Sequence, residues 1–279
     1  MTEQVAVTTT VTPVTTQELV TAFEAAGAMV HEFHEVFEHP IGAELTESLG
    51  EVRVIERMTY INEELLEGLK AALARDAVEV VDAMGDAVYL LIGNLVECGA
   101  VKEDLSGLAQ EVFGHLSEDE MGNLVEGVRL DIEAAGSLHR FVRTNFVRMQ
   151  HLVLEEIESV MSFEEQEDVA KLAVAPMSAS LALTIMTLMK TSMSADPLEV
   201  MTAIHQSNMS KLLPSELPDE EACREFMAAN MNSKMSADEL SFNRSASGGW
   251  IAKCKATGKI IKNPLYQAVD LAPLVHITL

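Results

Sequence analysis

The stretch INEELLEGLKAALARDAVEVVDAMGDAVYLLIG, Ile61 to Gly93, decides the fold class of this chain. Its apolar residues recur at intervals of three and four, which is the period of an amphipathic helix. The pattern breaks near Asp76, which together with Glu79 forms a D-x-x-E box of the kind that begins a helix. We therefore expect two consecutive helices, residues 51–74 and about 77–98, separated by a short turn.

Acidic residues gather at helical spacing on both expected helices. They stand three or four positions apart, as Glu63, Glu64 and Glu67 on the first helix and as Glu79, Asp82 and Asp86 on the second. Residues at this spacing share a helix face, so an antiparallel hairpin would bring the two sets to the same level. Carboxylates that face one another need a counter-charge, and oxygen ligands favour Mg²⁺ or Mn²⁺ over zinc. The pattern favours a metal site, with a solvated acidic face as the alternative.

Few basic residues are available to neutralise these acids. Between Arg57 and Lys102 the chain has only Lys70 and Arg75, which leaves a divalent cation as the obvious compensation. A di-iron centre is the competing kind of metal site, and such centres in helical bundles use Glu-x-x-His pairs. None of the eight histidines follows a Glu at that spacing, so iron–oxygen chemistry is disfavoured.

The composition indicates a helical globular protein. Of its 279 residues 48% are apolar but only 5% are aromatic, and 16 are Met, which suits helical cores filled with Leu, Met and Ala. No segment shows convincing strand alternation. The uncharged run Leu172–Met189 contains Pro176 and is only marginally long enough to span a membrane, so we expect a buried helix there.

Charge and cysteine usage restrict the partners and the compartment. The formal net charge of −25 disfavours nucleic acid polymers and anionic membranes, although not a small anion that carries Mg²⁺. Three distant cysteines without a CxxC pair, and an N-terminus without signal-peptide features, predict a reduced, cytoplasmic compartment. Residues 240–269 reverse the charge because they contain no acid and carry Arg244, Lys253, Lys255, Lys259 and Lys262.

Several motifs occur in an order that is typical of one family. The chain has EELLE at 63–67 and EVVD at 79–82. The other motifs are FHEVFEHPIG at 33–42, DAMGDAVYLLIG at 82–93, HQSNMSK at 205–211 and GKIIKNPLYQAVDL at 258–271. Together they resemble the all-α NTP pyrophosphohydrolases, the MazG-like and phosphoribosyl-ATP-pyrophosphohydrolase-like family, whose signature is EExxE followed by ExxD. The resemblance covers roughly residues 25–99 and 198–272.

The resemblance implies Mg²⁺-dependent hydrolysis, with Mn²⁺ as a substitute, of a (deoxy)nucleoside triphosphate between its α and β phosphates. It assigns metal binding to Glu64, Glu67, Glu79 and Asp82. Glu63 would bind a further ion or, with Glu64, activate the attacking water. The phosphates would meet Lys211, Lys259, Lys262 and Tyr266. The base and sugar would be bordered by Phe33, His34, Phe37 and Asn208.

We therefore expect an all-α fold, a helical bundle of this family's type with a large helical insertion and a loop-rich basic C-terminal tail. A disordered N-terminal arm should precede the catalytic helices, which begin with a helix over 16–37. The insertion should be helical, with breaks at Gly114, Gly136 and Pro176. A closing helix and the phosphate-binding tail should pack on the catalytic helices as one domain. The boundaries of these four parts are 1–15, 16–99, 100–195 and 196–279.

Two interpretations of the insertion stay open. RMTYINEELLEG (57–68) has a faint echo in RMQHLVLEEIES (148–159), as expected of a degenerate second copy that completes the bundle within one chain. A simple packing insertion is the alternative, and the sequence leaves a homo-oligomer open.

Two further functions also remain. They are phosphoribosyl-ATP hydrolysis, and a non-catalytic helical interaction protein with surface acids. SNMSK and the GK-x-x-K tail favour the nucleoside triphosphate substrate.

Overall fold

The computed structural model describes residues 11–44, 49–113, 116–162, 174–230 and 236–279. Expectations for residues 1–10, and for the break at Gly114, lie outside the described residues. The first three helices are α1 (Thr16–Phe37), α2 (Glu51–Ala74) and α3 (Ala77–Glu97). Their bounds confirm the helices predicted from the sequence to within a residue or two.

The remaining helices and the strands follow in chain order. They are α4 (Lys102–Phe113), α5 (Glu118–Ala135), α6 (Leu138–Ser162), α8 (Val174–Met193), α9 (Pro197–Met209), α10 (Glu220–Asn230), β1 (Leu240–Arg244) and β2 (Trp250–Cys254). Two 3₁₀ turns complete the described elements, Ala237–Glu239 and Ala272–Leu274. The all-α class is confirmed.

The turn between α2 and α3 is built by two adjacent residues. Arg75 ends α2 in the left-handed conformation, with φ of 59°. Asp76 then caps α3, because its side chain accepts hydrogen bonds from the backbone N–H groups of Val78 and Glu79. The chain thereby reverses within two residues, and α2 packs along α3 as a hairpin.

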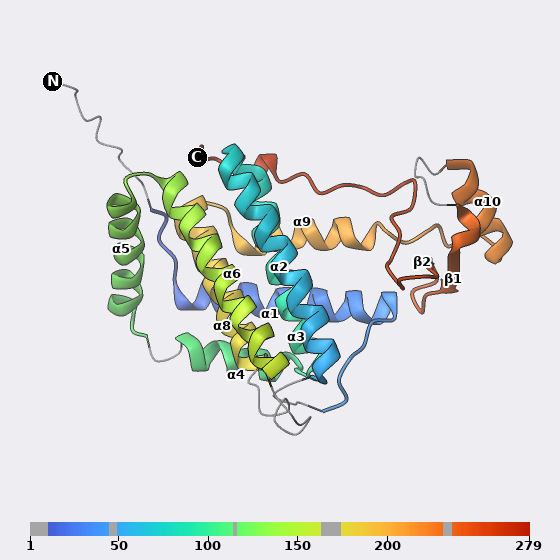
Figure 1. Ribbon diagram of the computed structural model, residues 1–279, viewed down its shortest axis with the longest axis horizontal. Helices are drawn as coiled ribbons and strands as arrows, with labels where there is room; N and C mark the ends of the chain where they lie inside the picture. Colours follow the sequence, from blue (N-terminus) through green and yellow to red (C-terminus); the bar gives the residue numbers. More distant parts are fainter. Residues whose placement is uncertain (1–10, 45–48, 114–115, 163–173, 231–235) are drawn as a thin grey trace.

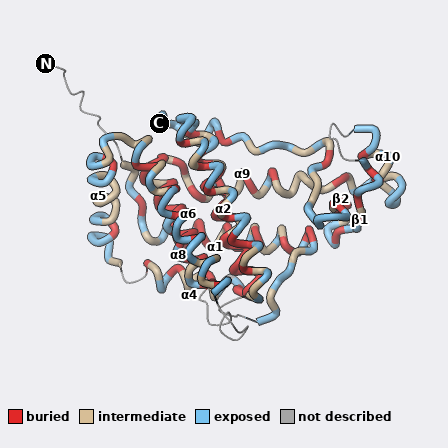
Figure 2. Tube along the Cα trace, in the orientation of Figure 1, coloured by how far each residue is buried: buried red, intermediate tan, exposed pale blue. Residues whose placement is uncertain are grey.

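The insertion packs against this hairpin. Helix α6 lies along α2 and helix α8 lies along α3, so that four helices form a bundle (Figure 1). Gly68 of α2 allows the close approach, because a Cβ there would stand 2.2 Å from the ring of Phe146 on α6. Side chains of the insertion and of α1–α3 belong to one apolar core, which runs along the facing sides of the helices (Figure 2).

Helix α8 is the apolar run that sequence analysis assigned to a buried helix. Among the described residues it is the one helix long and apolar enough to cross a membrane, and 72% of its most apolar window is buried inside the protein. Pro176 lies in the first turn of α8, and the residues directly before this helix lie outside the described part of the chain. It is the third residue of the helix, where a missing N–H removes no helical hydrogen bond.

Two short strands form an antiparallel hairpin that sequence analysis missed. Strand β1 pairs with β2 from Leu240↔Cys254 to Arg244↔Trp250. The hairpin and α10 lie together at one end of the molecule (Figure 1) and share a small core of their own. The strands have five residues each, and their stability comes from packing on α10, a contact between segments that are distant in sequence.

The N-terminal arm also differs from expectation. Residues 11–15 contact the protein: Thr12 donates its backbone N–H to the carbonyl of Thr191 at 3.1 Å, and its hydroxyl lies 2.8 Å from that of Ser194. Val14 is buried and Thr15 caps α1. The predicted disordered arm therefore cannot extend to residue 15.

Candidate active site

The acidic residues singled out in the sequence lie on the two helices of the α2–α3 hairpin. On α2, Glu64 is half-buried while Glu63 and Glu67 are exposed. On α3, Asp82 is half-buried and Glu79 is exposed in the first turn. The half-buried carboxylates thus lie below a rim of exposed ones, an arrangement suited to a site that opens to solvent.

The pKa values show that the two helices bring their carboxylates together. Burial raises the pKa of Glu64 to about 7, and repulsion from Asp86, Glu67, Asp82 and Glu63 adds to it. Burial, and then Asp82, raise the pKa of Asp86 to about 7. Burial and repulsion from Glu79 also raise the pKa of Asp82. The groups predicted from sequence therefore act on one another across the hairpin.

These residues fit a divalent cation in their chemistry. One carboxylate oxygen of Asp82, Oδ1, is buried without a hydrogen-bond partner, and such an oxygen is available to a cation. Ionised carboxylates are the ligands that Mg²⁺ and Mn²⁺ prefer. In the part of the chain that the structure describes, no three His, Cys, Asp or Glu side chains form a ready-made metal shell. Like charges without a counter-ion repel, so ligation requires these side chains to move together.

The lysines of the basic C-terminal tail lie near the carboxylates of the α2–α3 hairpin. Burial lowers the pKa of Lys211 to about 8, while Asp86 and Glu64 act in the opposite direction as nearby negative charges. The next cationic neighbours of Lys211 are Lys262 and Lys259, which both lower its pKa. Lys211 and Lys262, from two segments far apart in sequence, thus lie beside the carboxylates of α2 and α3, and Lys259 lies near Lys211.

Tyr266, a predicted phosphate ligand, is already engaged. Its hydroxyl lies 2.8 Å from the hydroxyl of Ser207 on α9. Its ring carries the Lys262 ammonium at 4.3 Å from the centroid, which is cation–π distance. In this conformation Tyr266 holds Lys262 and joins the tail to α9.

The predicted base-binding residues divide into accessible and buried ones. Phe33 is half-buried, and Lys211 Nζ lies 5.8 Å from its ring centroid. Asn208 accepts a hydrogen bond of 2.5 Å from Lys211, so both lie beside the lysines. His34 is only 3% exposed and Phe37 is fully buried. Neither offers a surface to a ligand, because His34 faces Pro40 and Phe37 packs near Ile251.

Sequence reasoning left two features outside the site. The first is Asp86, which its spacing placed in the acidic group but which the family resemblance did not include among the metal ligands. The second is a chain of polar contacts in which Tyr89 Oη lies 3.1 Å from Nδ1 of His205, and Nε2 of His205 lies 3.3 Å from Glu32. Phe33 packs edge-on against Tyr89. No spacing rule links residues of three separate helices, so only the fold reveals this contact.

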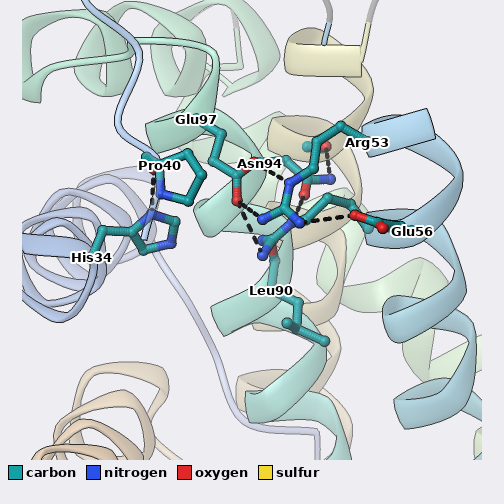
Figure 3. Close-up of polar contacts among 9 residues, drawn as sticks. His34, Pro40, Arg53, Glu56, Leu90, Asn94 and Glu97 are labelled. Carbon is teal, nitrogen blue, oxygen red and sulfur yellow. Dashed lines mark hydrogen bonds and ion pairs between the residues drawn. The ribbon is translucent and has the colours of Figure 1, made fainter. Parts of the chain in front are cut away.

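A buried polar cluster lies beside the site and fixes the hairpin (Figure 3). Arg57 donates to the side chain of Asn94 at 2.6 Å and to the carbonyl of Leu90. Arg53 binds Glu97 through two hydrogen bonds of 2.6 Å. Burial lowers the pKa of Arg57 to about 10. These paired groups join α2 to α3 at one register, which sets the level at which the carboxylates meet.

Comparison with known proteins finds one family. Residues 30–112 match the family model described as phosphoribosyl-ATP pyrophosphohydrolase. Comparisons with curated proteins and with solved structures give no match. The matched segment includes all of α2 and α3, and with them the acidic residues of both helices. This segment is thus similar to the MazG-like, all-α NTP pyrophosphohydrolase superfamily, which supports a function of the pyrophosphohydrolase type.

Proposed function

We propose that this chain is a Mg²⁺-dependent pyrophosphohydrolase that cleaves a (deoxy)nucleoside triphosphate between its α and β phosphates. The products are the nucleoside monophosphate and pyrophosphate. The observation that carries the proposal is the convergence of opposite charges, because the carboxylates of α2 and α3 influence the pKa of Lys211 and are met by Lys262. A triphosphate needs both kinds of group, a cation-binding side and a direct anion-binding side.

The carboxylates divide into two roles under this proposal. Those that would hold Mg²⁺ are Glu64, Glu67, Glu79 and Asp82. A bound Mg²⁺ supplies a more acidic water and neutralises negative charge on the phosphates. Glu63 is exposed next to Glu64, where it would accept the proton that the attacking water loses.

The lysines and the aromatic ring hold the substrate. Lys211, Lys259 and Lys262 would bind phosphate oxygens by charge-assisted hydrogen bonds. Phe33 lies next to Lys211, so a base stacked on its ring would leave the phosphates near the lysines. Asn208 would read the base or sugar with its amide after it releases Lys211. His34 and Phe37 are buried behind Phe33 and would contribute through packing alone.

Phosphoribosyl-ATP is the second candidate substrate, because the matching family model carries that activity in its description. It shares the α–β anhydride and the triphosphate-derived charge, so the same carboxylates and lysines would serve. The two substrates differ at the adenine ring, and therefore at Phe33 and Asn208. A non-catalytic helical protein is the third alternative, and it would gain no stability from Mg²⁺.

A substrate panel tests the proposal. Canonical and modified dNTPs and NTPs, with phosphoribosyl-ATP, are incubated with the protein and Mg²⁺, and pyrophosphate and monophosphate are measured. We expect Mg²⁺-dependent release of pyrophosphate, lost in Glu64→Gln and kept in the control Glu225→Gln, an exposed residue of α10. Hydrolysis of phosphoribosyl-ATP alone would favour the second candidate. Release of inorganic phosphate, or full activity of Glu64→Gln, would refute the proposal.

A further inference from the structure

The tail that carries Lys259 and Lys262 is attached to the protein on two sides. On one side it follows the edge of β2, since Cys254 donates its N–H to the carbonyl of Lys259 at 2.9 Å and Ile261 donates to Ala252 at 2.8 Å. On the other side lies the C-terminal end of α9, which leads to Lys211. The relative position of the three lysines therefore depends on how these two sides are joined.

Asn263 makes the join next to both groups of lysines. Its side-chain N–H groups donate to the carbonyls of Ser210 at 2.8 Å and of Leu212 at 2.5 Å. These two residues flank Lys211, and Asn263 itself follows Lys262. One side chain thus fixes the backbone on both sides of one lysine to the backbone of another.

Asn263 cannot serve as a ligand in this arrangement. It is only 4% exposed, and its oxygen accepts a hydrogen bond of 2.5 Å from the backbone N–H of Leu265. Both of its donors and its acceptor are therefore used within the protein. Pro264 follows directly and restricts the backbone of Asn263 to extended conformations, which favours this geometry further.

The β-hairpin is in turn fastened to α1. Glu38, just after α1, accepts hydrogen bonds from Asn243 at 2.9 Å and from Lys253 at 3.2 Å. Ser245 donates to the carbonyl of Val36 at 2.8 Å. These bonds attach the hairpin to the end of α1. Because the tail pairs with β2 of the same hairpin, they also help to hold the tail in place.

We infer that Asn263 is a positioning residue that sets the spacing between Lys211 and Lys262, and that Glu38 supports the same lysines through the hairpin. This inference rests on the proposed function in one respect, that the lysines bind phosphate. It adds that they bind as a preformed group, so that the affinity for pyrophosphate depends on residues that never touch it.

The test compares four forms of the full chain. They are wild type, Asn263→Ala, Glu38→Gly and the control Asn230→Ala, an exposed residue of α10 whose side chain donates to the carbonyl of Phe226 within the same helix. Glu38→Gly removes the carboxylate at a position with φ of 57°, which glycine adopts readily, so folding is preserved. Binding of pyrophosphate to the Mn²⁺-saturated protein is measured by calorimetry, alongside Mn²⁺ affinity, kcat and KM. Trypsin cleavage after Lys262 reports directly on the attachment of the tail.

For Asn263→Ala we expect about tenfold weaker pyrophosphate binding and a similar rise in KM, from the loss of buried hydrogen bonds. The kcat should stay within about twofold, Mn²⁺ affinity should not change, and cleavage after Lys262 should accelerate. Glu38→Gly should shift pyrophosphate binding in the same direction, and Asn230→Ala should match wild type.

Wild-type pyrophosphate affinity in both Asn263→Ala and Glu38→Gly would overturn the inference, as would a fall in kcat at constant KM. If Asn263→Ala does not fold, Glu38→Gly alone decides. If no form hydrolyses any nucleotide, the proposed function fails. Pyrophosphate affinity and trypsin cleavage then still decide whether these residues position the lysines.

Discussion

Replacing Glu64 by Gln tests the carboxylate site both without and with its cation. Burial, and then neighbouring carboxylates led by Asp86, raise the pKa of Glu64 from 4.5 to about 7. A carboxyl group whose pKa is raised by folding destabilises the folded state when it is ionised. The cost is absent below pH 4.5, grows up to about pH 7 and is constant above it.

The size of the effect follows from the two pKa values. The difference between 4.5 and about 7 corresponds to about 3.4 kcal/mol at about 1.4 kcal/mol for each pKa unit. Glu64 is half-buried, so solvent screening reduces this to about 1–2 kcal/mol. At pH 8 without metal, Glu64→Gln should raise the free energy of unfolding by that amount. At pH 4 the variant and wild type should be equally stable.

Adding Mg²⁺ should reverse the order of stability. Wild type should gain about 2.7 kcal/mol at a cation concentration a hundred times its Kd, whereas the variant has lost a ligand. Urea unfolding at pH 8 and pH 4, in EDTA and in Mg²⁺, measures both effects, with Glu225→Gln as the control. A variant less stable than wild type in EDTA at pH 8 would refute the reasoning, and so would an equal gain from Mg²⁺.

Three further outcomes follow from the geometry. Gly93→Ala should lower the free energy of unfolding by about 1–3 kcal/mol, because the new Cβ would stand 2.3 Å from Nη2 of Arg57; equal urea midpoints would contradict this. Burial lowers the pKa of His34 from 6.5 to about 4, so wild type should lose stability relative to His34→Gln as the pH falls from 6.5 to 4. Urea unfolding of both proteins at pH 7, 6 and 5 measures this change. A stability difference that stays constant over this range would show that His34 titrates normally. The double variant Lys259→Ala/Lys262→Ala should raise KM about tenfold at unchanged Mn²⁺ affinity in calorimetry, and an unchanged KM would remove these lysines from the phosphate site.

The helical part of the fold could be predicted because its signals are local. Thr15 and Asp76 cap α1 and α3 with their own side chains, and apolar residues at helical spacing mark the buried faces between the caps. The β-hairpin carried no comparable signal. Leu240 and Phe242 alternate with polar residues for only a few positions, and their partners on α10 are distant in the chain. Packing between remote segments decided that element.

The candidate site also has a part that the sequence predicted and a part that only the fold reveals. Spacing placed Glu64 and Asp82 on facing helices, and the charge reversal of the tail singled out Lys262; the pKa shifts link these groups. Spacing did not distinguish Phe33, half-buried beside Lys211, from Phe37, four residues later and fully buried. That distinction depends on Ile251 of the hairpin, which covers Phe37. Because the sequence did not reveal the hairpin, it also did not reveal that Phe37 is buried.

The insertion leads to a last prediction, the number of metal sites in each chain. Helix α6 packs along α2 as a second copy of the hairpin would. It carries two adjacent acids, Glu155 and Glu156, as α2 carries Glu63 and Glu64. The chemistry around them differs. Glu155 lies 3.1 Å from Nε2 of exposed His151, and Val174–Met193, the residues of α8, contain no acid to face either glutamate. Since a cation needs carboxylates from two helices, each chain should bind Mn²⁺ at the α2–α3 site alone.

Counting bound Mn²⁺ by EPR in wild type, in Glu64→Gln and in Glu155→Gln/Glu156→Gln shows which helices hold the ion. We expect the first substitution to abolish binding and the double substitution to leave it intact. Manganese lost from the double variant, or kept in Glu64→Gln, would place a working site in the insertion and contradict its reading as a degenerate copy.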